Sequence, residues 1–367
     1  MFIIILSVII LAAVIIQTVV YRKHWDRNLF LSFRFSSPEA FEGDALYLYS
    51  EISNKKILPL PWLVVDYELS VNLLFPGELG LGTGEVIKTG LFSVMGYRRV
   101  RRKSRFVCSK RGYYRLRRIK LTGSNLLHTQ TYAGETKSNA ELTVFPKLLN
   151  HFDELNIILN SLDAMLLTHS LINPDPFTFK GLREYTPDDP LRNVNFKASA
   201  VAQQLMVNVY NPMSSKRLEI ILNMEHNAPR INAELYEQAI RLAATVANHY
   251  ISADVVVGLY SNGRDAVLGE QCGISPGTHQ AQLYAVYQAL GRLSLTFEPG
   301  HISAYLNTLQ DGGCIYLLIS PYWEDDLRDA LVDMQARGLD IAAVIPVEKK
   351  TKIKNVPSQK IIPWEAV

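Results

Sequence analysis

Cysteine is scarce in this chain of 367 residues, which has only three. Cys108, Cys272 and Cys314 form an odd set without a Cys-x-x-C pair, so the sequence does not predict a disulfide framework. No Asn-x-Ser/Thr acceptor for glycosylation occurs either. Both absences are typical of a protein whose bulk lies in the reducing environment of the cytoplasm.

Catalytic signatures are also missing. The glycine-rich stretch Gly77–Gly84 is not followed by the Gly-Lys-Ser/Thr of a phosphate-binding loop. Neither His-Glu-x-x-His nor Gly-x-Ser-x-Gly occurs, and the eight histidines are scattered. We therefore predict a protein that is not an enzyme and has no cofactor. A hydrolase that uses Asp188, Asp189 and Glu225 is the alternative.

Long apolar runs are limited to one, Phe2–Val20, which is interrupted only by Ser7, Gln17 and Thr18. About 19 residues at ~1.5 Å each span roughly 30 Å, the thickness of a bilayer core. No Lys or Arg precedes the run, which disfavours a cleaved signal peptide. The sequence therefore predicts a transmembrane anchor over residues 1–21.

Basic and aromatic residues follow the apolar run directly. Arg22, Lys23 and Arg27 predict that this end faces the cytoplasm, and Tyr21 and Trp25 suit the membrane interface. We expect a single-pass protein of the inner (cytoplasmic) membrane with its soluble domains in the cytoplasm.

Acidic residues are absent from residues 98–120, although the net charge of the whole chain is only +3. The basic residues there are Arg98, Arg99, Arg101, Arg102, Lys103, Arg105, Lys110, Arg111, Arg115, Arg117, Arg118 and Lys120. Interleaved apolar residues favour two strands with a basic outer face, which either protects a sheet edge or binds lipid. Anionic headgroups attract each nearby basic residue by about 1 kcal/mol. Because the anchor holds this region near the bilayer, we predict contact with an anionic lipid surface through Arg98, Arg99, Arg101, Arg102, Lys103 and Arg105. Too few aromatics are interleaved to predict nucleic-acid binding.

Residues 29–147 carry the pattern of short strands. Apolar and polar residues alternate over 29–37, 45–53 and 62–70, with turn signals between these segments. Short strands at this spacing predict an antiparallel β-sandwich of the immunoglobulin-like type.

Residues 148–176 have helical periodicity. The apolar stripe of this segment consists of Phe152, Leu155, Ile158, Leu159, Leu162 and Leu166. Polar residues occupy the opposite face, so we predict a helical linker that packs across the domain junction and ends at residues 173–176.

Residues 177–350 alternate between strands and helices, and residues 351–367 are expected to form a tail. Strands are expected at 218–222, 254–260, 314–320 and 341–346, and helices at 232–250, 279–293 and 324–337. Such alternation predicts an α/β domain with a mostly parallel, doubly wound sheet.

A charged motif over residues 179–200 leads this half, and Pro187 and Pro190 stiffen its turn. Its expected interaction residues are Arg183, Glu184, Tyr185, Asp188, Asp189, Arg192, Asn195 and Lys197. No nucleophile–base pair accompanies the carboxylates, so an active site is disfavoured. A partner-docking surface and an inter-domain salt-bridge latch both remain open.

The motif resembles the Arg-Glu-Tyr-x-x-Gly-Asp-x-x-Arg signature of the family catalogued as domain of unknown function 58. The residues that match this family are Arg183, Glu184, Tyr185, Asp189, Arg192, Asn195, Lys197, Ser199 and Ala200. Asp188 replaces the usual glycine and Phe196 the usual tryptophan, so the chain resembles a divergent member. The resemblance implies that the α/β domain is von Willebrand factor A-like.

Domains of that type often hold a divalent metal at the carboxyl ends of their strands, through Asp-x-Ser-x-Ser and a second aspartate. This chain has instead a degenerate set formed by Asn223, Glu225, Asn227 and Ser320. Magnesium requires hard oxygen ligands that usually include carboxylates. We therefore predict no metal at this position.

The resemblance also implies a partner, a MoxR-type AAA ATPase, in envelope, stress or complex-maturation processes. We therefore predict a membrane-anchored cytoplasmic adaptor that binds other proteins. The alternatives are a passive envelope scaffold with a lipid-binding basic sheet and a divergent metal-dependent hydrolase.

Overall fold

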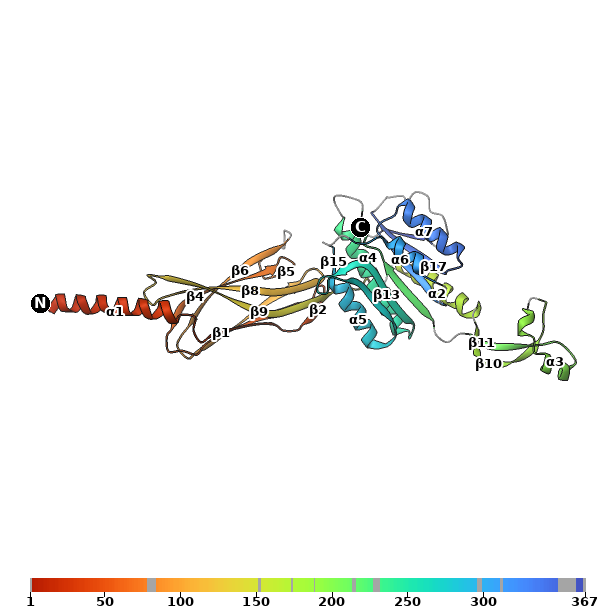
Figure 1. Cartoon of the computed structure of the whole chain (residues 1–367), viewed down its shortest axis with the longest axis horizontal. Helices are drawn as coiled ribbons and strands as arrows, with labels where there is room; N and C mark the ends of the chain where they lie inside the picture. The colour runs from red at the N-terminus through yellow and green to blue at the C-terminus, as the bar shows by residue number, and fades with distance from the viewer. Residues whose placement is uncertain are drawn as a thin grey trace. The chain divides into compact units, whose positions relative to one another are not determined.

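The computed structural model describes residues 2–77, 84–150, 153–172, 174–187, 189–212, 216–226, 232–295, 299–310, 313–348 and 361–365 (Figure 1). The chain divides into two compact units, Met1–Lys147 and Leu148–Val367. The predicted end of the β-rich domain at residue 147 coincides with this division.

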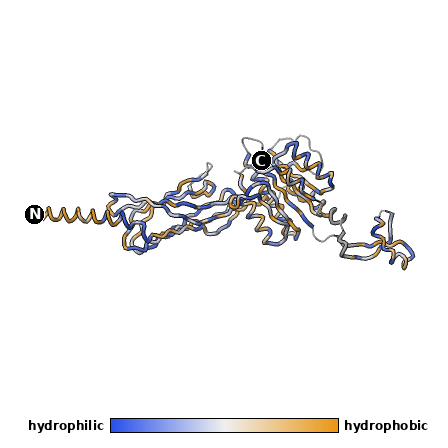
Figure 2. Tube along the Cα trace, in the orientation of Figure 1, coloured by the Kyte–Doolittle hydropathy of each residue, from blue (hydrophilic) through white to orange (hydrophobic). Residues whose placement is uncertain are grey.

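Unit 1 begins with the helix α1 (Phe2–His24), which is apolar over nearly its whole length (Figure 2). Among the described residues, α1 is the one helix that is long and apolar enough to cross a membrane. The helix continues beyond the predicted anchor, residues 1–21, through the basic residues Arg22, Lys23 and His24.

Nine strands follow α1 in the described part of unit 1. They are β1 (Leu29–Phe35), β2 (Glu39–Phe41), β3 (Ala45–Asn54), β4 (Leu60–Ser70), β5 (Leu73–Leu74), β6 (Glu85–Val94), β7 (Arg99–Cys108), β8 (Gly112–Ser124) and β9 (Thr131–Phe145). The first sheet has the order β1-β3-β7-β5, and the second has the order β2-β9-β8-β4-β6. Neighbouring strands are antiparallel except β2 and β9.

The two sheets share one apolar core. Leu48 and Phe106 from the first sheet and Leu63 and Leu116 from the second are at most 1% exposed and belong to the same cluster. Strict alternation along each strand places these side chains on one face. The predicted two-sheet sandwich is therefore present.

The end of α1 is packed into this same core. Tyr21 and Trp25 are 1% and 5% exposed, and the Tyr21 hydroxyl donates to the Pro59 carbonyl at 2.7 Å. The indole of Trp25 lies against Gly123, where a Cβ atom would approach the ring to 2.7 Å. A larger residue at position 123 would therefore displace the indole that joins α1 to the sandwich.

Unit 2 contains a mixed sheet, several helices and a small separate sheet. Its helices are α2 (Asp153–Ile172), η1 (Leu191–Asn193), α3 (Phe196–Ala202), α4 (Ala233–Ser252), α5 (His279–Arg292), α6 (Ile302–Thr308) and α7 (Asp325–Ala336). Its strands are β10 (Pro174–Glu184), β11 (Met206–Pro212), β12 (Arg217–Leu222), β13 (Val256–Asp265), β14 (Gln271–Gly277), β15 (Leu293–Ser294), β16 (Ile315–Ile319), β17 (Ile341–Val347) and β18 (Ile361–Glu365).

The larger sheet has the order β14-β13-β12-β16-β17-β18, with β15 paired to β13. Strands β12, β13, β16, β17 and β18 pair in parallel, and β14 and β15 are antiparallel. Leu306 of α6 and Leu331 of α7 belong to one core cluster with Leu318 of β16. The helix α4 contacts β12 and β13, and α5 contacts α4, β13 and β14. The alternation of strands and helices thus correctly predicted parallel pairing, but β14, α6 and β18 were not expected.

The helix α2 belongs to unit 2, where the Tyr250 hydroxyl of α4 donates to Asp163 at 3.0 Å, and its packing across the domain junction stays a prediction. Two other sequence-based expectations need correction. The expected tail includes strand β18, which pairs with β17 because its residues are apolar. The charged motif does not lead into the larger sheet but forms a separate arm with β10 and β11.

Lys56 allows a test of the junction between α1 and the sandwich. Its Nζ is buried without a hydrogen-bond partner in the described structure, and burial lowers the pKa of Lys56 to about 8. Between pH 8 and the pKa of Lys56 in the unfolded chain, the unfolded state binds more protons than the folded state. The free energy of unfolding therefore rises with pH over this range. We expect Lys56→Met to raise the melting temperature at pH 7, with a gain that shrinks by pH 10. A gain independent of pH, measured by thermal unfolding in detergent, would contradict this assignment.

Candidate functional site

The predicted strand-end residues converge in unit 2. Asn223 and Glu225 directly follow β12, and Ser320 directly follows the neighbouring strand β16. Asn223 donates through Nδ2 to the Ser320 hydroxyl at 3.1 Å, and all three residues are at most 7% exposed. The fourth member of the predicted set, Asn227, lies outside the described residues.

Asn262 in β13 completes this group and was not found by sequence reasoning. Its Nδ2 donates to Asn223 Oδ1 at 2.9 Å and to the Gly300 carbonyl at 2.6 Å, while its Oδ1 accepts from the Met224 amide. An asparagine in a predicted strand carries no motif. Only the parallel pairing of β12 with β13 places it beside Asn223.

The amide and hydroxyl groups of this cluster satisfy one another. Asn223 Oδ1 accepts from the Glu225 amide and from Asn262, and the Ser320 hydroxyl donates to the Tyr322 carbonyl. Their oxygens are therefore committed to internal hydrogen bonds, and Asn223 places an NH₂ group where magnesium would need a carboxylate. This set does not fit an octahedral magnesium site.

A different set of side chains beside this network has the chemistry of a metal site. Ligand atoms of Glu225, His301 and Asp326 all lie within 4.8 Å of one another. The Glu225 carboxylate accepts from the Ile302 amide at 3.0 Å and pairs with His301 Nδ1 at 3.0 Å. Glu225 is fixed and 9% exposed at its side chain, whereas the His301 side chain is 86% exposed.

The pKa values of two tyrosines depend on the carboxylates of this site. Burial and the Glu225 carboxylate raise the pKa of Tyr236 to about 12. Burial, the neighbouring carboxylates of Asp326 and Glu324, and Glu225 raise the pKa of Tyr322 to about 12 as well. Burial is the larger cause of both shifts, and the negative charge of Glu225 contributes to each.

The arm that carries the charged motif is held together by its own residues. Arg183 donates two hydrogen bonds to the Asp189 carboxylate, at 2.7 and 2.5 Å, and the amide and hydroxyl of Thr186 also donate to it. Arg183 and then Thr186 hold the pKa of Asp189 well below its usual range. This Arg183–Asp189 pair closes the turn after β10.

Further residues of the motif fix α3 onto β11. Asn195 caps α3 by accepting from the Ala198 amide at 2.9 Å and bonds Asn208 of β11 through Nδ2. Ser199 bonds the Met206 amide at 2.8 Å. The Glu184 carboxylate likewise accepts from Gln204.

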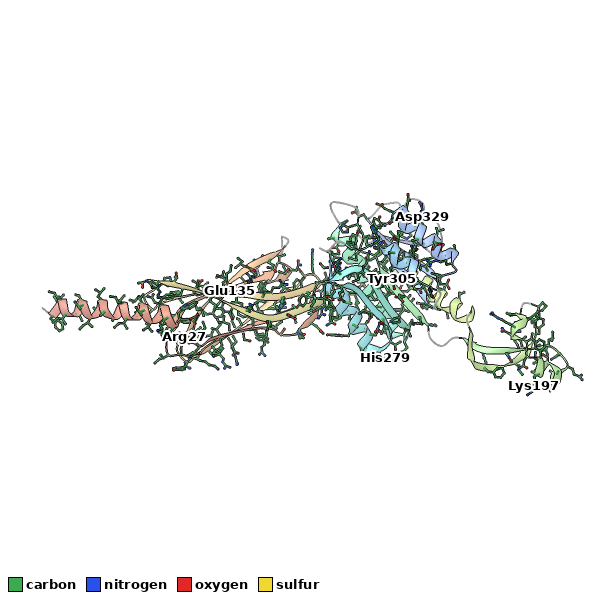
Figure 3. All side chains as sticks on the ribbon, in the orientation of Figure 1. Arg27, Glu135, Lys197, His279, Tyr305 and Asp329 are labelled. Carbon is green, nitrogen blue, oxygen red and sulfur yellow. The ribbon has the colours of Figure 1, made fainter. Side chains whose placement is uncertain are left out.

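The remaining members of the predicted set point to solvent or are not described. Arg192 and Lys197 are exposed (Lys197 is labelled in Figure 3), and Tyr185 is half-buried. Asp188 lies outside the described residues. Some residues of the motif thus stabilise the arm through hydrogen bonds, and others are exposed on its surface.

The arm exposes large apolar side chains, and two of them, Leu182 and Val201, line an open groove. The exposed residues are Phe179, Leu182, Leu191, Phe196, Val201 and Leu205. The groove, of about 470 Å³, is lined by residues that include Leu182, Ala198, Val201 and Met206. Sequence reasoning had concentrated on the charges and missed this apolar surface.

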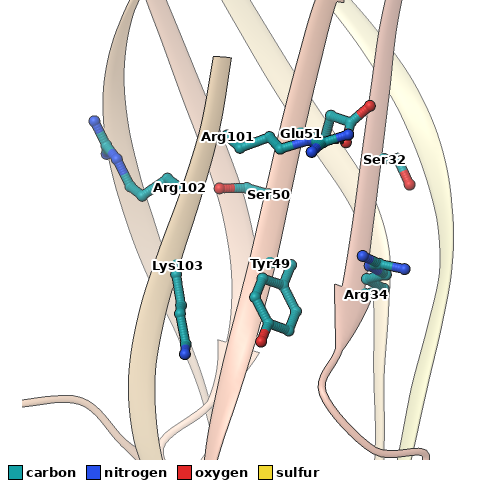
Figure 4. Close-up of a pocket in the computed structure, with 8 residues that line it drawn as sticks. All are labelled: Ser32, Arg34, Tyr49, Ser50, Glu51, Arg101, Arg102 and Lys103. Atoms are coloured by element: carbon teal, nitrogen blue, oxygen red, sulfur yellow. Dashed lines mark hydrogen bonds and ion pairs between the residues drawn. The ribbon is translucent and has the colours of Figure 1, made fainter. Parts of the chain in front are cut away.

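The predicted basic stretch falls on two different sheets. Side chains of β7 share the outer face of the first sheet with Arg34 and Tyr49, around a hollow of about 470 Å³ (Figure 4). Lys103 lies over the rings of Tyr47 and Tyr49, and Glu51 pairs with Arg99 and Arg101. The basic residues of this face are Arg34, Arg99, Arg101, Lys103 and Arg105, and Glu51 is the acidic residue among them.

Part of the rest of the basic stretch is paired with acidic residues. On β8, Arg115 pairs with Glu141 and Arg118 with Glu135, both across the ladder with β9. Arg102 points away from the basic face, stacks over Phe92 and donates to the Leu91 carbonyl. The outer face of β1, β3 and β7 keeps an excess of positive charge, because Glu51 is the acidic residue among its five basic ones.

Comparisons with known proteins add no functional information. No family model matches the chain, and no curated protein matches it. Among solved structures, the chain is similar to the CARDB domain of the PF1109 protein from Pyrococcus furiosus in complex with di-metal ions (TM-score 0.21, 12% identity, 32% of this chain and 93% of that chain).

Two further solved structures are similar over parts of their length. One is the alkylpurine DNA glycosylase AlkC of Pseudomonas fluorescens (TM-score 0.19, 11% identity, 31% of this chain and 31% of that chain). The other is the sporulation control protein Spo0M of Bacillus subtilis (TM-score 0.19, 8% identity, 43% of this chain and 58% of that chain). All these TM-scores are too low to carry an argument about fold or function.

Metal binding at Glu225, His301 and Asp326 is directly measurable. Two carboxylates and an imidazole suit Zn²⁺ better than Mg²⁺, which prefers oxygen ligands alone. We expect calorimetric titration of the full chain in detergent to give a Zn²⁺ signal and no Mg²⁺ signal. His301→Ala and Asp326→Asn should each weaken Zn²⁺ binding by about tenfold or more.

Asp329→Asn is the matched control, because Asp329 lies on the same helix and pairs only with Arg328 among the described residues (labelled in Figure 3). It should leave Zn²⁺ affinity unchanged. Equal affinity in the His301→Ala variant would show that the three residues do not form a site.

Proposed function

We propose that this chain is a membrane-anchored cytoplasmic adaptor that binds a protein partner through the arm formed by β10, β11, η1 and α3. The observation that carries the proposal is the exposure of large apolar side chains on that arm. Leu191, Phe196 and Val201 are 70%, 75% and 85% exposed. Apolar surface of this kind is typical of protein–protein contacts.

The construction of the arm supports a docking role. The Arg183–Asp189 pair and the Asn195 cap hold its backbone through short, local contacts. The apolar side chains are thereby presented on a preorganised surface, which lowers the conformational entropy lost on binding. Arg192 and Lys197 lie beside them and offer charges for specificity.

The resemblance of the motif supplies the identity of the proposed partner, a MoxR-type AAA ATPase. When the six strands are numbered in chain order from β12, with the short β15 left out, the order of the larger sheet is 3-2-1-4-5-6. This is one of the two common doubly wound orders, and it supports a von Willebrand factor A-like domain. The antiparallel two-sheet sandwich of unit 1 similarly supports an immunoglobulin-like assignment. The apolar helix α1 supports anchoring in the inner membrane.

A passive scaffold that binds lipid through the basic face is the second candidate. It is favoured by the excess of Arg34, Arg99, Arg101, Lys103 and Arg105 over Glu51 on one sheet face. The adaptor is preferred because the basic face alone gives no role to the apolar arm.

The adaptor proposal predicts which substitutions release the partner. Phe196→Ser combined with Val201→Ser should reduce co-purification of the ATPase with the full chain at least tenfold. Both side chains are exposed, so the melting temperature should change little. Quantitative capture from detergent-solubilised membranes, together with thermal unfolding, measures both quantities.

Val332→Ser is the matched control, because Val332 is an exposed apolar residue of α7 outside the arm. Asp189→Asn should instead weaken capture by loosening the arm, which limited proteolysis of the 185–190 turn would detect. Undiminished capture by the double variant would refute docking through the arm.

A further inference from the structure

Large apolar side chains are exposed at the end of the sandwich where α1 ends. The loops β3–β4, β6–β7 and β8–β9 meet there, together with the start of β1. We call these side chains the apolar rim: Phe30, Ile57, Met95, Tyr97, Leu126 and Leu127, between 51% and 80% exposed. So much apolar surface at one end is typical of a surface that contacts a membrane or a protein.

The rim loops are fixed relative to one another and to α1. The Tyr97 amide donates to the Lys56 carbonyl at 3.0 Å, and Asn54 Nδ2 donates to the Leu58 and Met95 carbonyls. The β8–β9 loop follows Gly123, against which Trp25 packs. The rim is therefore one continuous feature and not a set of independent loops.

Contacts along α1 show how far the sandwich reaches toward the bilayer. Val14, Gln17 and Thr18 are half-buried while the residues around them are exposed, and the Tyr132 hydroxyl donates to the Thr18 carbonyl at 3.3 Å. A helix of 23 residues is about 34 Å long, close to the thickness of the bilayer core, and Thr18 lies ~9 Å before its end. If α1 spans the membrane, the end of the sandwich lies at the boundary between headgroups and acyl chains.

The charges around the rim match an anionic leaflet. Lys55, Arg98 and Arg99 are exposed beside the rim loops, and Arg22 and Lys23 end α1. Aromatic and aliphatic side chains flanked by basic residues are typical of segments that lie in the membrane interface. A strand advances ~3.3 Å per residue, so Arg105 lies about 20 Å farther along β7 than Arg99, beyond one Debye length.

We propose that the apolar rim inserts into the interface of the anionic leaflet that α1 enters and fixes the sandwich against the membrane. The occupant of this surface is the lipid bilayer, because α1 holds the rim covalently at that depth. The proposal rests on the proposed anchoring by α1. It also narrows the predicted lipid contact to the end of β7 nearest α1, which carries Arg98, Arg99 and Arg101, and leaves out Arg105.

An environment-sensitive label tests the insertion. The full chain with Leu127→Cys, labelled with the fluorophore NBD, is reconstituted in vesicles of phosphatidylglycerol and phosphatidylethanolamine. We expect blue-shifted emission and quenching by lipids that carry a spin label near the acyl carbonyl. Of the native cysteines, Cys108 and Cys272 are buried and Cys314 is half-buried, so the native chain, labelled in the same way, is the blank that is subtracted.

Ile87→Cys is the matched control, because Ile87 is also an exposed apolar residue, 60% exposed, but lies at the opposite end of the sandwich. Its label should emit as in water and resist quenching. Equal emission from the labels at positions 127 and 87 in an integral protein would overturn the rim proposal. Extraction of the chain by alkaline carbonate would instead show that α1 does not anchor it, so the two failures are distinguishable.

Discussion

The burial of Tyr21 and Trp25 in the sandwich core is the contact on which the proposed membrane arrangement depends. An apolar helix joined by a flexible linker would leave the sandwich free to rotate above the bilayer. Here the last turns of α1 share a core with Phe33 and Leu121, and the hydroxyl of Tyr21 is hydrogen-bonded to the β3–β4 loop. The depth of the helix therefore sets the height of one end of the sandwich.

The strand ends of unit 2 show how amide side chains change a site that resembles a metal position. Carboxylates there would repel one another and require a cation, but Asn223 and Asn262 carry donors and acceptors that satisfy each other. Glu225 keeps the one buried negative charge of this network, and it is turned toward His301. A polar network of this kind stabilises the carboxyl ends of the strands without an ion. Among the described residues, it leaves Glu225, His301 and Asp326 available to bind a metal ion.

In the arm, the charged residues that bond each other and the apolar side chains that are exposed are different residues of the motif. Arg183 and Asp189 attract attention in the sequence, yet they bond each other and close a turn. No sequence pattern predicts that Phe196 and Val201 are exposed, because a helix of seven residues is too short for its periodicity to show which face is buried. Among the described side chains of the arm, Val194 and Val207 are the buried apolar ones, and so small a core leaves Phe196 and Val201 exposed.

The sequence by itself determined the elements that depend on local periodicity: the apolar helix, the alternating strands of the sandwich and the buried parallel strands such as β12 and β16. It also placed Asn223, Glu225 and Ser320 at strand ends. Only the tertiary structure decided that Asn262, His301 and Asp326 join them, since these residues come from separate segments brought together by strand order. It likewise decided that Ile57, Tyr97 and Leu127 share one end of the sandwich, because loops distant in sequence meet only when strands pair.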